Sequence, residues 1–131
     1  DSRWHRSAGV LSLQALLSGI RHCRIMQKME FIEAAAFTKY VHKYLSDDEY
    51  AGLQSFLLQY PESGKVVPKS GGVRKVRWAI SGKGKSGGVR VIYYFKRQHN
   101  EIWLLTIYSK NEMENIPAHI LRQIAKEIEH D

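Results

Sequence analysis

Apolar residues recur at helical spacing in two neighbouring segments, residues 34–45 and 47–60. In the first segment, one helix face carries the i, i+3, i+4, i+7 pattern of Phe37, Tyr40, Val41 and Tyr44. Pro61 ends the second segment, whose inward apolar residues are Tyr50, Leu53, Leu57 and Tyr60. At the start of the second segment, Ser46 and Glu49 form a capping-box pattern, which favours a helix start. The two segments are therefore predicted to form an antiparallel helical hairpin.

A period of two residues replaces the helical period in the middle of the chain. Residues 73–80 alternate apolar residues with the cations Lys75 and Arg77, so the apolar set should face the core and the cations should face away from it. Residues 89–95 and 102–108 are apolar almost throughout, as central strands are. Three consecutive strands are therefore predicted.

A short strand at residues 29–33 and a C-terminal helix complete the predicted order, β-α-α-β-β-β-α. The helix has Pro117 in its first turn, where proline is tolerated, and an apolar face of Ile116, Ile120, Leu121, Ile124 and Ile128. This order defines an α+β fold. We expect an antiparallel sheet with the helices packed on one face. The other face should be open and should carry cations and tyrosines.

Residues 1–28 differ in character from residues 29–131, so a boundary is predicted between them. Apolar residues recur at helical spacing within the first part, at Leu13, Leu16, Leu17 and Ile20. Two interpretations stay open for this N-terminal extension. It forms a short amphipathic helix, or it is a non-native or poorly ordered segment with Met29 as the natural start. The second interpretation is favoured.

Charge is distributed very unevenly along the chain. The net charge is +7, and residues 63–100 contain ten Lys and Arg but no Asp or Glu. Such a surface attracts nucleic acid or another polyanion. The single cysteine, Cys23, allows no internal disulfide and is compatible with a reducing cytosol. The six histidines lack the paired spacing of metal ligands, so no metal site is predicted.

A membrane span is not expected, because no segment approaches the ~20 apolar residues that a spanning helix needs. The apolar run at residues 10–20 follows Arg3 and Arg6, as the core of a signal peptide would. However, Arg21 and Arg24 follow it in place of a small-residue cleavage site. A secretory signal is therefore rejected, and a cytoplasmic location is predicted.

Several motifs occur in the order that a known family shows. The strands and the loop read V-R-K-V-R, K-G-K, G-G-V-R-V-I-Y-Y-F and L-L-T-I-Y-S-K-N-E. With the order β-α-α-β-β-β-α, residues 29–131 resemble the RelE/HigB family of type II toxin–antitoxin toxins and are most similar to its HigB branch. The resemblance implies a RelE-like fold and a ribosome-dependent mRNA endoribonuclease (mRNA interferase). Such a bacterial toxin inhibits translation and growth.

The resemblance also implies the partners. They are mRNA in the ribosomal A site, the ribosome with its rRNA, and a cognate antitoxin protein, with no membrane, metal or cofactor. Two modes of antitoxin binding stay open: an acidic segment over the cationic face, or a partner on the helices.

The chemistry of this family agrees with the residue types present. RNA is cut without a metal when its own 2′-OH attacks the adjacent phosphate, given a base, an acid and cations that stabilise the developing charge. Arginine stays protonated and suits the phosphate oxygens. Neighbouring cations lower the pKa of a lysine from its usual value of about 10.4 and so favour its use as a base.

The resemblance implies a set of catalytic residues on the strands, in the loop and at the end of the last strand: Arg77, Lys83, Lys85, Arg90, Tyr108 and Lys110. Arg90 is assigned to the scissile phosphate, and Tyr108 to stacking on a base or relaying a proton. Three more residues are assigned to RNA binding: Arg74, Lys75 and Tyr94. Asn111 stands where some family members have arginine, which leaves the division of acid and base roles open.

Two other classes of function compete with this interpretation. A non-catalytic RNA-binding module would use the same cations only to contact phosphates. A ParE-like toxin would instead poison DNA gyrase.

Some of these residues also have a purely structural interpretation. For Arg90, the structural alternative is an ion pair with Glu112 or Glu114. Tyr93, on the opposite strand face, is predicted to lie in the core. Two further cations are expected to be solubilising turn residues: Lys96 and Arg97.

Overall fold

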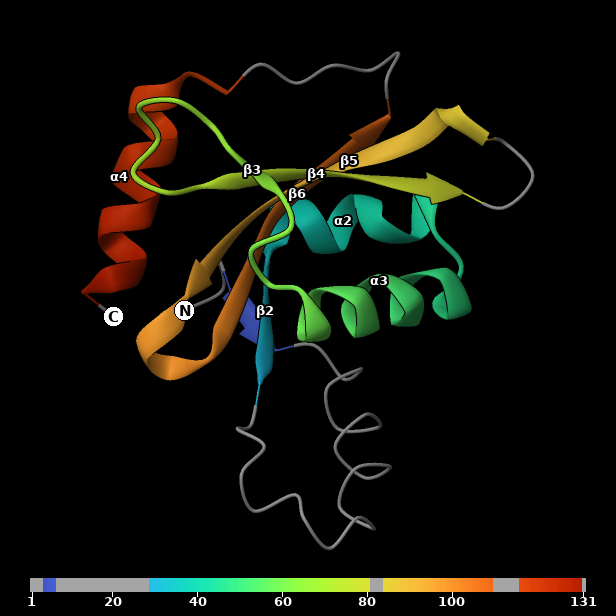
Figure 1. The fold of residues 1–131 in the computed structure, drawn as a ribbon, viewed down its shortest axis with the longest axis horizontal. Coiled ribbons are helices and arrows are strands. Elements are labelled where there is room, and N and C mark those ends of the chain that lie inside the picture. Colours follow the sequence, from blue (N-terminus) through green and yellow to red (C-terminus); the bar gives the residue numbers. More distant parts are fainter. Residues whose placement is uncertain (1–3, 7–28, 81–83, 110–115, 131) are drawn as a thin grey trace, which may run out of the picture.

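The computed structural model describes residues 4–6, 29–80, 84–109 and 116–130 (Figure 1). Its helices are α2 (Ala35–Tyr44), α3 (Asp47–Gln59) and α4 (Ala118–Glu129), with a 3₁₀ turn at Arg97–His99. Its strands are β1 (Trp4–Arg6), β2 (Glu30–Ala34), β3 (Lys65–Val66), β4 (Arg74–Ile80), β5 (Gly84–Lys96) and β6 (Glu101–Ser109). The α+β class and the predicted order are confirmed by β2, α2, α3, β4, β5, β6 and α4. The short strands β1 and β3 were not predicted from the sequence.

The sheet is mixed rather than wholly antiparallel. Its strand order is β1-β2-β6-β5-β4-β3. The pair β2–β6 is parallel, whereas the other pairs are antiparallel. The reason is topological: β4, β5 and β6 run antiparallel in succession, and the last of them returns beside β2 in the same direction. The expectation of an antiparallel sheet is corrected at this one pair.

Helices cover both faces of the sheet, which corrects the expectation of helices on one face. On the first face, α2 and α3 pack against the strands through Phe37, Val41, Leu53 and Leu57. On the second face, α4 packs through Leu121, Ala125 and Ile128. Neighbouring residues of β5 contribute to opposite cores, Tyr93 to the first and Tyr94 to the second. Because the central strands are apolar on both sides, each face requires a cover.

The face beneath α4 is therefore only partly open. The helix lies toward the end of the sheet away from the C-terminal end of β4 (Figure 1). Lys96 fixes its C-terminal end, because Lys96 Nζ donates to the carbonyl oxygen of Ile128 at 2.7 Å. Lys96 is only 2% exposed, so the expectation of a solubilising turn residue is wrong. A lysine at this position satisfies one of the unpaired carbonyls at the helix C-terminus.

Strand β1 belongs to the N-terminal extension and joins the sheet beyond β2. The ring of Trp4 packs edge-on against Trp103 of β6, with the ring centroids 4.8 Å apart. The helix predicted around residues 13–20 lies outside the described residues. None of the described helices has the length and apolarity that a membrane span requires.

The capping box at the start of α3 is confirmed. Ser46 Oγ accepts from the Glu49 amide at 3.1 Å, and the Ser46 amide donates to Glu49 Oε1 at 2.8 Å. Together these bonds satisfy two backbone groups at the helix start.

Replacing Ser46 with alanine should destabilise the fold by about 1 kcal/mol, because the Glu49 amide loses its side-chain acceptor. Urea denaturation measures this change. Ser46→Asp is the matched control, because aspartate is also a good N-cap residue and should stay close to the parent protein. Equal stabilities for the alanine and aspartate variants would show that this cap contributes nothing.

Candidate functional site

Three predicted site residues lie side by side on three adjacent strands. Arg77 of β4 pairs with Arg90 of β5, and Arg90 pairs with Tyr108 of β6. Directly paired residues of antiparallel strands point to the same face, with their Cβ atoms about 4.5–5.5 Å apart. The strand register therefore brings together residues that are far apart in the sequence, on the face that also carries α4.

The two arginines line a surface hollow. Arg77 is exposed and Arg90 is half-buried. The hollow has a volume of about 330 Å³ and is lined by Arg77, Trp78, Ala79, Val89 and Arg90. Arg90 Nη1 approaches the Gly88 carbonyl oxygen at 3.5 Å, which is a long contact, and among the described residues no carboxylate pairs with Arg90. Adjacent guanidinium groups at an accessible hollow can bind the oxygens of an anion such as a phosphate.

Backbone irregularities surround these arginines. The register between β4 and β5 shifts between Trp78 and Ile80. Gly88 lies so close to β4 that a Cβ atom on it would be 2.6 Å from the Trp78 carbonyl oxygen, a distance that forces the strands apart. Bulges of this kind change the direction in which strand side chains point. Here the bulge and the glycine set the position of Arg90 relative to Arg77.

Tyr108 is the least accessible member of this row. It is 7% exposed and belongs to the core beneath α4. A tyrosine buried to this extent has little free ring surface for stacking on a base. Of its two predicted roles, only stacking on a base requires an exposed ring face. The burial of Tyr108 is compatible with the other role, relaying a proton.

Tyr94 lies on the same face as Arg90, four residues further along β5, and α4 covers it. It is 9% exposed, and its hydroxyl donates to the Glu129 carboxylate of α4. Burial is the main cause that raises the pKa of Tyr94 well above its usual value, and the hydrogen bond to Glu129 adds to it. In this arrangement Tyr94 holds α4 on the sheet, and the structure does not bring it together with Arg77 and Arg90.

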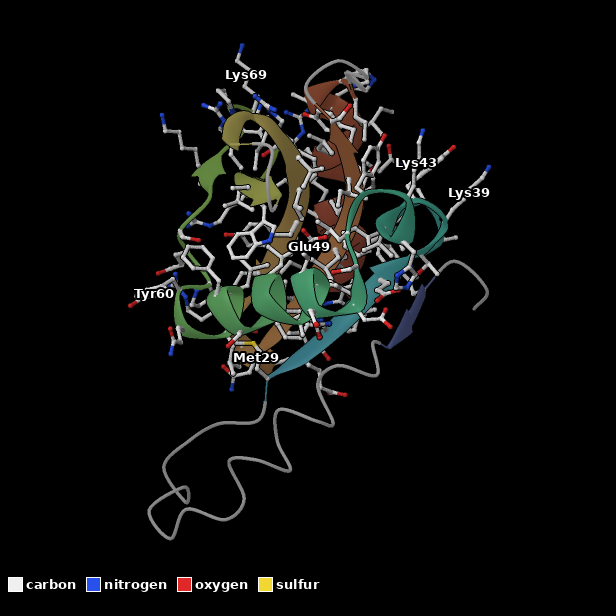
Figure 2. All side chains as sticks on the ribbon, turned by 90° about the vertical axis from the view of Figure 1, so that its right-hand side faces the viewer. Met29, Lys39, Lys43, Glu49, Tyr60 and Lys69 are labelled. Carbon is white, nitrogen blue, oxygen red and sulfur yellow. The ribbon has the colours of Figure 1, made fainter. Side chains whose placement is uncertain are left out.

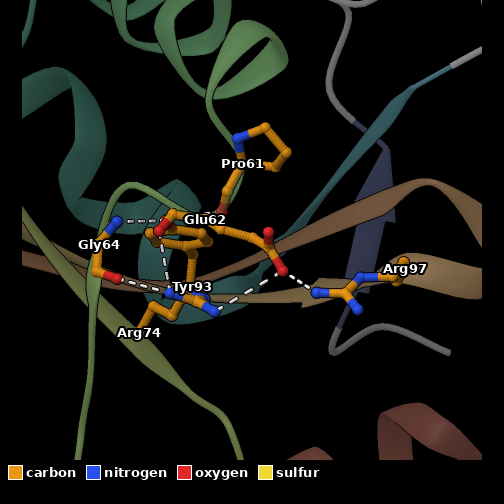
Figure 3. A network of polar contacts seen from close by, with 6 residues as sticks. All are labelled: Pro61, Glu62, Gly64, Arg74, Tyr93 and Arg97. Carbon is orange, nitrogen blue, oxygen red and sulfur yellow. Dashed lines mark hydrogen bonds and ion pairs between the residues drawn. The ribbon is translucent and has the colours of Figure 1, made fainter.

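Arg74 is also separated from the arginine row. It pairs with Tyr93, so it points to the opposite face from Arg77. Figure 3 shows its guanidinium against the loop that follows α3. Arg74 Nη1 donates to the carbonyl oxygens of Glu62 at 3.0 Å and Gly64 at 2.8 Å, and Nη2 lies 3.9 Å from the Glu62 carboxylate. The same carboxylate pairs with Arg97, but this second ion pair is exposed, so it is mainly Arg74 that stabilises the loop.

The remaining predicted residues are described only in part. Lys75 is exposed on the same strand face as Arg77. Lys83 and Lys110 lie outside the described residues, as do Glu112 and Glu114. Lys85 lies on β5, and its side chain is not described. Within the described ranges, no group of three or more His, Cys, Asp or Glu side chains is placed to hold a metal ion.

Sequence reasoning missed the structural roles of Lys96 and Arg74. The burial of Lys96 could have been predicted from the alternation of residues along β5, because Lys96 shares a strand face with the apolar Ile92 and with Tyr94. The role of Arg74 had no such signal. Its partners are mainly backbone carbonyls of a loop, and the position of a loop is not encoded by a residue pattern.

Fold and site together define a class of protein: a small basic α+β domain with two arginines that line a hollow on a mixed sheet. The family model that matches the chain describes the RelE toxin of the RelE / RelB toxin-antitoxin system, and it covers residues 33–130. Because this match spans most of the sequence, the chain belongs to the RelE toxin family, and the protein is a toxin of a toxin–antitoxin system. Toxins of this family are in general endoribonucleases.

Proposed function

We propose that this toxin is a ribosome-dependent mRNA endoribonuclease of the HigB branch. The observation that carries the proposal is the pairing of Arg77 with Arg90 beside a hollow of about 330 Å³. The family membership supports the reaction class. The site would accept one phosphodiester of a message, and the cut would inhibit translation and growth.

The proposed reaction needs no metal ion. The 2′ oxygen attacks the adjacent phosphorus in line with the bond to the 5′ oxygen of the next nucleotide. A base takes the 2′ proton, the phosphorus–5′-oxygen bond breaks, and an acid protonates the leaving oxygen. The products are a 2′,3′-cyclic phosphate and a 5′-hydroxyl end. Arg77 and Arg90 stay protonated and stabilise the negative charge that develops on the phosphate.

The proton transfers are assigned to the lysines and the tyrosine around this row. Lys83, Lys85 and Lys110 are the candidates for the base, because neighbouring cations disfavour the charged form of a lysine. Tyr108, which pairs with Arg90, would relay a proton. Lys75, exposed two residues before Arg77, would contact RNA without taking part in the chemistry.

The proposed partners follow from the reaction. The message would be bound in the ribosomal A site, so the toxin would also contact rRNA and would act in the cytoplasm. A cognate antitoxin would neutralise the toxin, as expected of a toxin from this family.

Primer extension on a reporter mRNA tests this function. We expect breaks only in the translated frame and only when translating ribosomes are present. The downstream fragments should accept a labelled phosphate from polynucleotide kinase without prior dephosphorylation, because they begin with a 5′-hydroxyl. Fragments with a 5′-phosphate would contradict attack by the 2′-OH. An intact message together with trapped gyrase–DNA complexes would support the ParE-like alternative.

A further inference from the structure

A second pair of cations lies beside the Arg77–Arg90 pair. Lys65 of the edge strand β3 pairs with Lys75 of β4 in antiparallel register. Because Lys75 and Arg77 are two residues apart on one strand, the two pairs share a face and are separated by about 6 to 7 Å. We call this set the cation ladder: Lys65, Lys75, Arg77 and Arg90.

The cation ladder is electrostatically unfavourable for the protein alone. Like charges placed directly opposite one another in a sheet are destabilising. In the part of the chain that the structure describes, no carboxylate forms an ion pair with Lys65, Lys75 or Arg77. The nearby Glu62 is engaged by two other arginines, Arg74 and Arg97. Among the described residues, these three cations therefore have no carboxylate partner and can interact with an external anion.

The backbone around Lys65 is held in place despite the shortness of β3. Before it, the Gly64 amide donates to the buried Tyr93 hydroxyl at 3.0 Å. After it, the Val67 amide donates to the Val73 carbonyl oxygen at 2.8 Å. Lys65 itself is exposed, so a fixed backbone presents a free side chain. Such preorganisation lowers the entropic cost of binding a ligand.

We propose that Lys65 and Lys75 form a subsite for a backbone phosphate of single-stranded RNA, next to the phosphate at Arg77 and Arg90. This inference rests on the proposed function. The separation of the two pairs is comparable with that of neighbouring phosphates along an extended RNA strand. Contacts to phosphates fix the register of a nucleic acid without reading its bases. The subsite therefore positions the message and extends the RNA-binding face to β3.

Salt-dependent binding tests the subsite. The probe is a short single-stranded 2′-O-methyl RNA, whose blocked 2′ oxygen prevents cleavage, and fluorescence anisotropy gives Kd over a salt series. Each phosphate contact contributes about 0.7 to the slope of log K against log salt for single strands. Lys65→Ala should reduce this slope by about 0.7. At low salt it should weaken binding about fivefold.

Two further variants make the experiment specific. Lys65→Gln keeps a long side chain but removes the charge, so it should lose as much affinity as Lys65→Ala. Lys39→Ala is the matched control, because Lys39 is an exposed lysine that projects from α2, on the other face of the sheet (Figure 2). It should leave the slope unchanged.

The failure of the subsite can be told apart from the failure of the proposed function. An unchanged slope for Lys65→Ala, with a reduced slope for Arg77→Ala, would overturn the subsite and leave the RNA-cutting site intact. A parent protein that binds the probe without salt dependence and leaves translated mRNA uncut would overturn the proposed function, and the subsite with it.

Discussion

Replacing Arg90 with alanine should reduce cleavage of translated mRNA by on the order of 10²–10³-fold, the usual cost of removing one preorganised group that stabilises a transition state. The half-buried guanidinium lies beside Arg77 at the hollow, where it would contact the phosphate as negative charge develops. Cells that express the variant should therefore grow normally. The measurements are primer extension with translating ribosomes and a growth curve after induction.

Arg97→Ala is the matched control for Arg90→Ala. It removes the same side chain from a position that follows the C-terminal end of β5, where the Arg97 side chain is 73% exposed and pairs with Glu62. An exposed ion pair contributes little stability, so cleavage and folding should stay near the parent level. Circular dichroism checks that both variants fold. Full toxicity of a folded Arg90→Ala variant would refute the assignment of Arg90 to the scissile phosphate.

Replacing Tyr93 with phenylalanine should destabilise the fold by on the order of 2 to 4 kcal/mol, because two backbone groups lose their partner at once. The Tyr93 hydroxyl donates to the Pro61 carbonyl oxygen at 2.8 Å and accepts from the Gly64 amide at 3.0 Å (Figure 3). The residue is 0% exposed, so water cannot replace the hydroxyl while the fold stays closed. Urea denaturation monitored by tryptophan fluorescence measures the loss.

Tyr60→Phe provides the control for this prediction. The prediction that Tyr60 faces inward is wrong, because Tyr60 follows the last residue of α3 and is 57% exposed. The substitution removes the same hydroxyl, and its effect should stay within about 0.5 kcal/mol. If the two variants unfold at the same urea concentration, the hydrogen bonds of Tyr93 do not stabilise the loop after α3.

Local patterns in the sequence predicted most of the elements. The helical spacing and the capping box placed α2 and α3, and the observed bonds between Ser46 and Glu49 are those that the pattern implies. Alternation assigned the strand faces, so Tyr93 was predicted to lie in the core, where the structure has it. These inferences succeed because they depend on residues close together in the chain, whose geometry is set by the helix or strand period.

The site depends on contacts between residues that are far apart in the sequence. Alternation predicts that Arg77 and Arg90 avoid the first core, but their direct pairing depends on the register of the β4–β5 hairpin. That register depends on the bulge near Trp78 and on the close approach at Gly88. The glycine-rich stretch between the strands is compatible with several registers, so the pattern of residues does not choose among them.

By itself, the sequence determined the order of elements, the acid-free stretch at residues 63–100 and the family to which the residue motifs point. Only the tertiary structure decided that β2 runs parallel to β6, that α4 covers Tyr94, and that Arg74 holds a loop. The physical reason is the distance along the chain over which each interaction acts. Periodicity and capping act within a few residues, whereas strand register and helix placement depend on how whole apolar faces are buried against one another.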